Sequence, residues 1–168
     1  MYGPKGIGAL YVRGVKPRVK PDGLFYGGGQ ERNIRSGTLN VPGIVGFGKA
    51  IELAESERQD NWARWAEMKS TVVESLAERV DGVVFNGHPT QSVPSIVNFH
   101  VTGIEAEPVL VRLGMQGIAA SSGSACSTAS MEPSHVLTAM GISSEDAIGA
   151  LRLSFGRGQG TDDLPIDE

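Results

Sequence analysis

The hydrophobic pattern of the chain changes period at Asp81-Gly82, and this change constrains the fold more than any other feature. Before it, apolar side chains recur every three or four residues, which is the spacing of helices that bury one face. Asn40 is suited to cap a first helix with Pro42 in its first turn. A second helix, which carries Trp62 and Trp65 as expected core residues, is predicted to end at Asp81-Gly82.

Beyond this point the apolar residues fall into short alternating runs, the pattern of half-buried strands. Val97, Phe99 and Val101 are predicted to share one face of such a strand. Strands are predicted at Ala9–Val12, Val83–Asn86, Ser95–Val101 and Ala150–Phe155, and one is predicted to begin or end at Ile118-Ala119. Helices are predicted at Glu105–Leu113, from a capping Ser134 to Met140, and from Ser143 onward. This alternation indicates an α/β or α+β fold.

Composition excludes several classes of protein. The 168 residues are 40% apolar, which is enough for a core of ordinary size. The net charge of −4, with scattered Lys and Arg, offers no basic stripe for a nucleic acid. No window approaches the roughly 18 apolar residues of a membrane helix, and the first residues lack a signal-peptide pattern. The sequence therefore predicts a cytoplasmic protein that binds neither nucleic acids nor membranes.

Cys126 is the only cysteine, and it lies in the stretch ASSGSACSTAS among small hydroxyl side chains and glycine. A structural cysteine is normally packed among large apolar side chains, which this stretch does not contain. The composition therefore favours an accessible thiol, and thiolate is the reactive form of cysteine. A small residue in a tight loop remains the alternative from composition alone.

Two further segments contain residues suited to bind anions. Gly27–Thr38, GGGQERNIRSGT, combines glycines with arginines and hydroxyl groups, so its backbone could approach a phosphate closely. It matches neither a Rossmann fingerprint nor a Walker loop, so the glycine run taken alone favours a plain flexible loop. Arg152 alternates with Leu151 and Leu153, so its side chain is predicted on the opposite face of a strand. It either binds a carboxylate with its guanidinium fork or faces solvent.

The histidines His88, His100 and His135 show no metal-ligand spacing and are interpreted as structural or exposed.

Four segments in register resemble the second half of a cysteine desulfurase, a class-V aminotransferase of fold type I that depends on pyridoxal 5'-phosphate. They are YGPKGIGALYVR, GGGQERNIRSGTLNVPGIVGFGKA, SSGSACSTASMEPSHVL and LRLSFGR. The resemblance implies that residues 1–60 are the end of the large cofactor domain with its connecting helix. The fold implied is thus α/β, and residues 61–168 are then the small, α+β C-terminal domain that carries the cysteine loop.

The resemblance also implies a function. Cys126 attacks the sulfur of L-cysteine held by pyridoxal 5'-phosphate, and a persulfide forms while L-alanine is released. The sulfur then passes to an iron–sulfur scaffold protein or another acceptor, and Cys126 is also a possible [2Fe-2S] ligand shared with that scaffold. Thr38 matches a residue lent across a homodimer interface to the phosphate of the partner's cofactor. Arg152 matches the arginine that binds the substrate carboxylate.

One departure from the family pattern affects activity. The Schiff-base lysine of the family stands immediately before the segment that begins at Met1, and Lys5 matches a different, structural lysine. The isolated chain is therefore predicted to be inactive, a fragment with exposed apolar surface near Leu10 and Tyr11. The alternatives are a non-catalytic sulfur-carrier or scaffold-binding module, and a selenocysteine lyase, which usually has a shorter cysteine loop.

Overall fold

A computed structural model describes residues 2–122 and 132–164 of the chain. The structure divides into two compact units, unit 1 (Met1–Arg58) and unit 2 (Gln59–Glu168). The assignment of residues 1–60 and 61–168 to a large and a small domain of a complete enzyme stays a prediction.

Unit 1 contains one long helix, α1 (Val41–Ser56), as the sequence predicted. Asn40 caps it, since its Oδ1 accepts a hydrogen bond of 3.1 Å from the backbone N–H of Gly43. Pro42 lies in the first turn, where its missing N–H leaves no helical bond unmade. The other regular element described in this unit is the short 3₁₀ segment η1 (Gln30–Asn33).

The strand predicted at Ala9–Val12 is wrong, because residues 7–14 have no regular secondary structure. A strand needs a neighbour to accept and donate its backbone hydrogen bonds, and no strand in the described ranges pairs with this segment. Leu10 and Tyr11 are 73% and 86% exposed. The expected apolar exposure around these two side chains is therefore confirmed.

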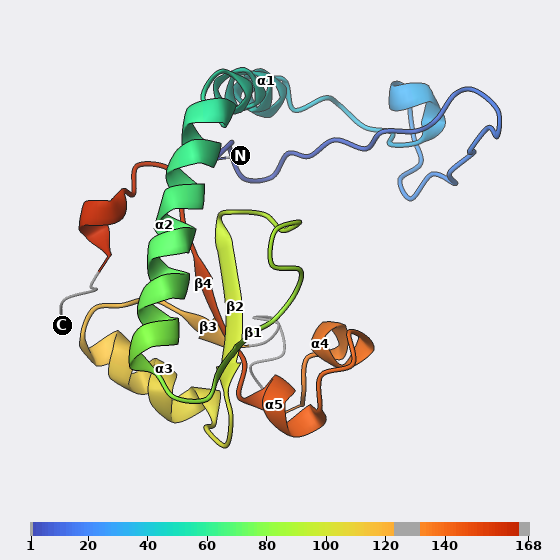
Figure 1. Cartoon of the computed structure of the whole chain (residues 1–168). Coiled ribbons are helices and arrows are strands. Elements are labelled where there is room, and N and C mark those ends of the chain that lie inside the picture. Colours follow the sequence, from blue (N-terminus) through green and yellow to red (C-terminus); the bar gives the residue numbers. More distant parts are fainter. Residues whose placement is uncertain (1, 123–131, 165–168) are drawn as a thin grey trace. The chain divides into compact units, whose positions relative to one another are not determined.

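Unit 2 contains the sheet and the helices that cover it (Figure 1). Its helices are α2 (Arg58–Arg79), α3 (Ala106–Met115), α4 (His135–Ala139) and α5 (Ser144–Ile148), with the 3₁₀ turn η2 (Thr161–Asp163). Its strands are β1 (Val83–Phe85), β2 (Ile96–Val101), β3 (Ser121–Ser122) and β4 (Leu151–Ser154). The first residue of α2 belongs to unit 1 by the division above.

The described strands form one antiparallel sheet in the order β1-β2-β4-β3. β2 and β4 are therefore internal strands, and they are neighbours although α3, β3, α4 and α5 lie between them along the chain. The strand predicted at Ile118-Ala119 is displaced to Ser121–Ser122. Its position follows from pairing, because Ser121 and Ser122 lie opposite Arg152 and Leu151.

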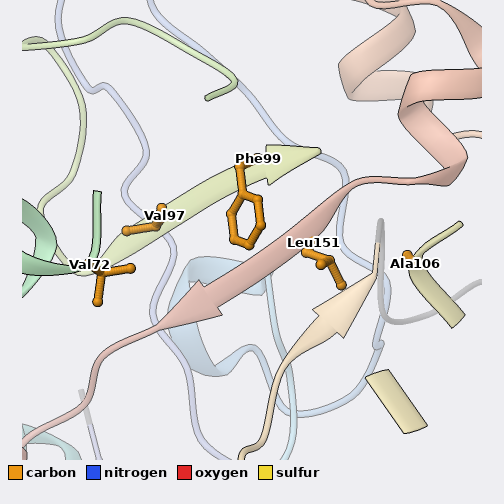
Figure 2. Close-up of a cluster of buried hydrophobic side chains, with 5 residues drawn as sticks. All are labelled: Val72, Val97, Phe99, Ala106 and Leu151. Carbon is orange, nitrogen blue, oxygen red and sulfur yellow. The ribbon is translucent and has the colours of Figure 1, made fainter. Parts of the chain in front are cut away.

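One face of the sheet is apolar and packs against α2 and α3. Figure 2 shows the buried cluster, in which Val97 and Phe99 of β2 and Leu151 of β4 share this face. Val72 of α2 and Ala106 of α3 complete the cluster. The predicted common face of Val97 and Phe99 is confirmed, and the next residue of that set, Val101, packs against the cluster.

The two tryptophans of α2 are less buried than the sequence predicted. Met68 and Val72 lie on the buried face of this helix together with Asn61. Trp62 follows Asn61 by one residue, which rotates it by about 100° around the helix axis. It is 51% exposed, so its assignment to the core is wrong. Trp65 is half-buried, and its Nε1–H donates to the carbonyl of Gly156 at 3.1 Å.

Candidate functional site

Arg152 lies on the internal strand β4, on the face of the sheet opposite the apolar cluster. Its Cα partners are Asn98 on β2 and Ser121 on β3. Directly opposed residues of antiparallel strands point to the same face, so Arg152 stands between an amide and a hydroxyl side chain. The predicted alternation with Leu151 is confirmed.

Arg152 is half-buried, and no described residue forms an ion pair or hydrogen bond with its guanidinium. A planar guanidinium presents parallel N–H donors that match the two oxygens of a carboxylate. Its fork is thus open to a carboxylate ligand as far as the described residues are concerned.

A chain of side-chain hydrogen bonds runs across the same face toward Arg152. Asn98 Nδ2 donates to the carbonyl of Leu151 at 3.0 Å. Asn86 Nδ2 donates to Asn98 Oδ1 at 2.8 Å, and His100 Nδ1 lies 3.1 Å from Asn86 Oδ1. The chain therefore connects β1, β2 and β4, and it ends at the residue before Arg152.

His100 joins this chain to α5. The side chain is buried, and its Nε2 lies 3.6 Å from Oδ1 of Asp146, an ion pair when the imidazole is protonated. Oδ2 of Asp146 accepts a hydrogen bond of 2.7 Å from Ser143 Oγ, which in turn caps α5 by accepting from Asp146 N–H at 3.1 Å. This agrees with the interpretation of His100 as a structural residue.

Thr38 lies in unit 1 at the end of the glycine-rich segment, and its side chain is exposed. The backbone before it is held from two sides. Gln30 Oε1 accepts a hydrogen bond of 2.9 Å from Gly37 N–H. Arg35 Nη1 donates to the carbonyls of Gly37 and Thr38, both at 3.2 Å. No described residue bonds the hydroxyl of Thr38, so it can act as a donor to a ligand oxygen.

The segment before Thr38 contains a left-handed turn. Glu31, Arg32 and Asn33 have φ values of 50°, 57° and 65°. This conformation costs an L-residue roughly 1–2 kcal/mol, and three successive residues adopt it here. A Cβ added to Gly23 would lie 2.5 Å from the carbonyl oxygen of Asn33, so only glycine fits there without displacement. The backbone of Gly27–Thr38 thus contains a specific left-handed turn, and the interpretation of this segment as a plain flexible loop stays a prediction.

Cys126 lies outside the described residues. Its predicted roles as sulfur acceptor and as a [2Fe-2S] ligand therefore stay predictions. The chain enters the segment 123–131 from β3, whose Ser121 lies opposite Arg152. It leaves the segment toward Ser134, the residue before α4. Across residues 2–122 and 132–164, no group of three or more His, Cys, Asp or Glu side chains is arranged to hold a metal ion.

None of the helices described is both long and apolar enough to cross a membrane.

The chain belongs to the aminotransferase class-V family, which it matches over residues 1–165. It is 48% identical over 162 residues to the cysteine desulfurase IscS of Methanosarcina thermophila, a match that covers 96% of this chain and 39% of the relative. It is 46% identical over 157 residues to the cysteine desulfurase IscS of Anaeromyxobacter dehalogenans, covering 94% of this chain and 38% of the relative. The chain thus spans about two fifths of the length of the curated relatives it matches.

Solved structures agree with this assignment. A NifS-like protein has a TM-score of 0.79 at 33% identity, over 96% of this chain and 40% of its own. A NifS-like protein from Rickettsia africae has a TM-score of 0.74 at 27% identity, over 89% of this chain and 38% of its own. The fold is thus that of part of a NifS-like cysteine desulfurase, in line with the expected α/β fragment of fold type I.

Sequence reasoning singled out Cys126, Thr38 and Arg152 but missed the side chains that surround Arg152. Asn98 and His100 alternate with Val97 and Phe99, so their common face was readable from the sequence. Their connection to Asn86 and β4 was not, because it depends on the order of the strands in the sheet.

Proposed function

We propose that the chain is the C-terminal portion of a cysteine desulfurase that transfers sulfur from L-cysteine to Cys126. The observation that carries this proposal is the half-buried Arg152 on an internal strand, with a guanidinium that no described residue pairs. An amino-acid substrate brings a carboxylate that fits this fork. The curated relatives named cysteine desulfurase support the same reaction.

The sulfur transfer balances as a displacement at sulfur. The thiolate of Cys126 attacks the sulfur of L-cysteine, and an S–S bond forms as the substrate C–S bond breaks. The substrate carbon keeps the bonding electrons and takes up a proton, so the product is L-alanine. Cys126 is left as a persulfide, and no external oxidant or reductant is consumed.

Pyridoxal 5'-phosphate is the cofactor implied by the family, and the described residues fit part of its site. The exposed hydroxyl of Thr38, next to backbone held by Gln30 and Arg35, suits a phosphate oxygen. When bound, the cofactor acts as an electron sink for the substrate carbon atoms. Arg152 would hold the substrate carboxylate, and Thr38 would donate to the phosphate of the partner subunit's cofactor in a homodimer.

The acceptor of the sulfur is proposed to be an iron–sulfur scaffold protein. Glycine, serine and threonine surround Cys126 in sequence, a composition suited to a loop that reaches a partner. A [2Fe-2S] cluster held jointly by Cys126 and the scaffold is a finer proposal that rests on the same loop. The cytoplasmic location predicted from the sequence stays a prediction.

The test uses a chimera in which this chain replaces the matching segment of the Methanosarcina thermophila relative. We expect the chimera to release alanine from L-cysteine and to carry a persulfide, detected by mass spectrometry on the peptide that contains Cys126. Cys126→Ser should abolish the persulfide and multiple turnover while pyridoxal phosphate remains bound. Cys126→Ser replaces only the sulfur atom by oxygen and keeps the shape of the side chain. Loss of activity in this variant therefore reflects the missing thiol rather than a failure to fold.

Two outcomes would contradict the proposal. Alanine release by Cys126→Ser at the parent rate would show that this thiol is not the sulfur acceptor. A chimera that binds pyridoxal phosphate but releases no alanine, and in which Cys126 accepts sulfane sulfur from a persulfide donor, would favour the sulfur-carrier module instead. The 168-residue chain is assayed in parallel, with inactivity expected.

A further inference from the structure

We propose that Asn86, Asn98 and His100 are positioning residues for Arg152, through a one-directional chain of hydrogen bonds that ends at the carbonyl of Leu151. This inference rests on the proposed role of Arg152 in binding the substrate carboxylate. It assigns a function to three polar side chains that the sulfur chemistry itself does not use.

The direction of the chain follows from its last acceptor. A backbone carbonyl can only accept, so the amide nitrogen of Asn98 must face Leu151, and they lie 3.0 Å apart. Asn98 Oδ1 is then free to accept, and it receives Asn86 Nδ2 at 2.8 Å. Asn86 Oδ1 in turn requires a donor, and the atom 3.1 Å away is Nδ1 of His100. His100 Nδ1 is therefore assigned a proton. The orientations of the Asn86 and Asn98 side-chain amides both depend on this donor.

The strand register places the chain directly beside the guanidinium. Asn98 and Arg152 are Cα partners, so their side chains leave the sheet on the same face within reach of each other. Asn86 extends the β1 pairing by one residue, because its N–H donates to the Asn98 carbonyl at 2.8 Å. The hydrogen bonds thus cross the strands in the row of the sheet that contains Arg152. They restrain the backbone of β4 at the position from which the guanidinium projects.

Asn98 also keeps the fork of Arg152 available. Its amide oxygen and nitrogen are both occupied, by Asn86 and by the Leu151 carbonyl. A carboxylate at the same position would lose the bond to that carbonyl and would pair with Arg152, which competes with a substrate carboxylate. A neutral amide opposite Arg152 is therefore the side chain that orders the strand without neutralising the arginine.

The far end of the chain is fixed in α5. His100 Nε2 lies 3.6 Å from Asp146 Oδ1, and Ser143 Oγ donates to the other oxygen of that carboxylate at 2.7 Å. His100 is only 6% exposed, so its ring is held by packing as well as by these partners. A displacement of α5 would therefore be transmitted to Asn86 and Asn98, and so to the strand of Arg152.

The kinetic test uses Asn86→Ala and Asn98→Ala in the chimera described above. Asn86→Ala removes a side chain whose described bonds go to Asn98 and His100, and we expect the KM for L-cysteine to rise about three- to tenfold, the cost of one lost hydrogen bond. The kcat and the yield of persulfide on Cys126 should stay near the parent values. Asn98→Asp should raise KM further than Asn98→Ala, since its carboxylate competes for Arg152.

Thr102→Ala is the matched control. It removes a hydrogen bond of 3.3 Å from Thr102 Oγ1 to the Gly82 carbonyl, near the same strands but outside the chain. Its KM should equal that of the parent. Unfolding midpoints are measured for every variant, and the assays are run below the lowest of them. If Asn86→Ala and Asn98→Ala lower the midpoint but leave KM at the control value, the chain is merely structural and the positioning role is overturned.

Arg152→Ala is measured in parallel to separate the two proposals. A large rise in its KM with unchanged KM in the Asn86 variant would overturn only the positioning role. An unchanged KM for Arg152→Ala would overturn the carboxylate role, and the positioning role with it.

A second measurement needs no activity. Nitrogen-15 chemical shifts of His100 in the 168-residue chain, at a pH where its ring is neutral, should report a proton on Nδ1. Asn86→Ala should abolish that preference. A ring whose only proton is on Nε2 in the unsubstituted chain would contradict the direction of the hydrogen bonds and overturn the proposal, whereas a ring protonated on both nitrogens keeps the Nδ1 donor and pairs with Asp146.

Discussion

Unit 2 buries apolar side chains against a sheet, whereas unit 1 leaves most of its large apolar side chains exposed to solvent. In unit 2, Val97, Phe99 and Leu151 lie between the sheet and the helices α2 and α3. In unit 1, the described hydrophobic residue that is buried is Ala50, the smallest of the aliphatic types. Its exposed apolar residues include Leu10, Tyr11, Val15, Val19, Leu24, Phe25 and Tyr26.

This difference shows where the stability of the chain originates. Burial of apolar area is the main favourable term in folding, so unit 2 carries the larger share of the folding free energy. Unit 1 relies on local interactions, among them the Asn40 cap of α1, the hydrogen bonds around Gly37 and the ion pair between Lys49 and Glu52. Such interactions order a segment but contribute about 1 kcal/mol or less each. The residues proposed to bind substrate and phosphate are thus held by different means, Arg152 by a packed sheet and Thr38 by a loop.

The largest effect is expected for a truncation in the core of unit 2. Phe99→Ala removes a ring that is 5% exposed, and we expect it to lower the free energy of unfolding by about 3–5 kcal/mol. Urea unfolding followed by circular dichroism measures this change. Leu24→Ala is the matched control in unit 1, where the side chain is 85% exposed, and a shift within about 0.5 kcal/mol is expected. Equal losses for the two variants would erase the contrast between the units.

A smaller effect is expected for the cap of α1. Asn40→Ala removes the acceptor for the Gly43 N–H and should destabilise the helix by about 1 kcal/mol. Because the cap is local to unit 1, hydrogen exchange should accelerate in the first turns of α1 and not in β2. Asn40→Asp keeps the acceptor oxygen and should preserve the slow exchange. Faster exchange in both units would show that they unfold together.

The smallest effect, and one of opposite sign, is expected in the left-handed turn. Arg32→Gly relieves a φ of 57° that glycine adopts at no steric cost, so we expect a local gain of up to about 1 kcal/mol. Slower hydrogen exchange of Gly37 N–H, which is bonded to Gln30, would report it. Arg32→Lys keeps the same strain and should leave the rate unchanged. Faster exchange in the glycine variant would mean that the Arg32 side chain itself holds the turn.

The helices of the chain were predictable because their signals are local. Asn40 caps α1 as predicted, and Asp81-Gly82 follows the end of α2, whereas Ser134 precedes α4 without the expected side-chain cap hydrogen bond. The alternation that assigns opposite faces to Phe99 and Asn98 is equally local, since it depends on the pleat of one strand. For the same reason the sequence alone places Arg152 on the face away from Leu151.

The sheet order and the surroundings of Arg152 were not predictable in this way. Whether Ala9–Val12 forms a strand depends on the presence of a neighbour, and the same is true of the exact position of β3. The exposure of Trp62 depended on which face of α2 meets the sheet.

The sequence by itself determined the helix ends, the apolar face of β2 and the residues suited to anion and sulfur chemistry, because each is a property of neighbouring residues. Only the tertiary structure decided that β4 lies between β2 and β3, and hence that Asn86, Asn98 and His100 lead to Arg152. Strand pairing is a choice among distant segments, and its free energy depends on how all of them pack at once.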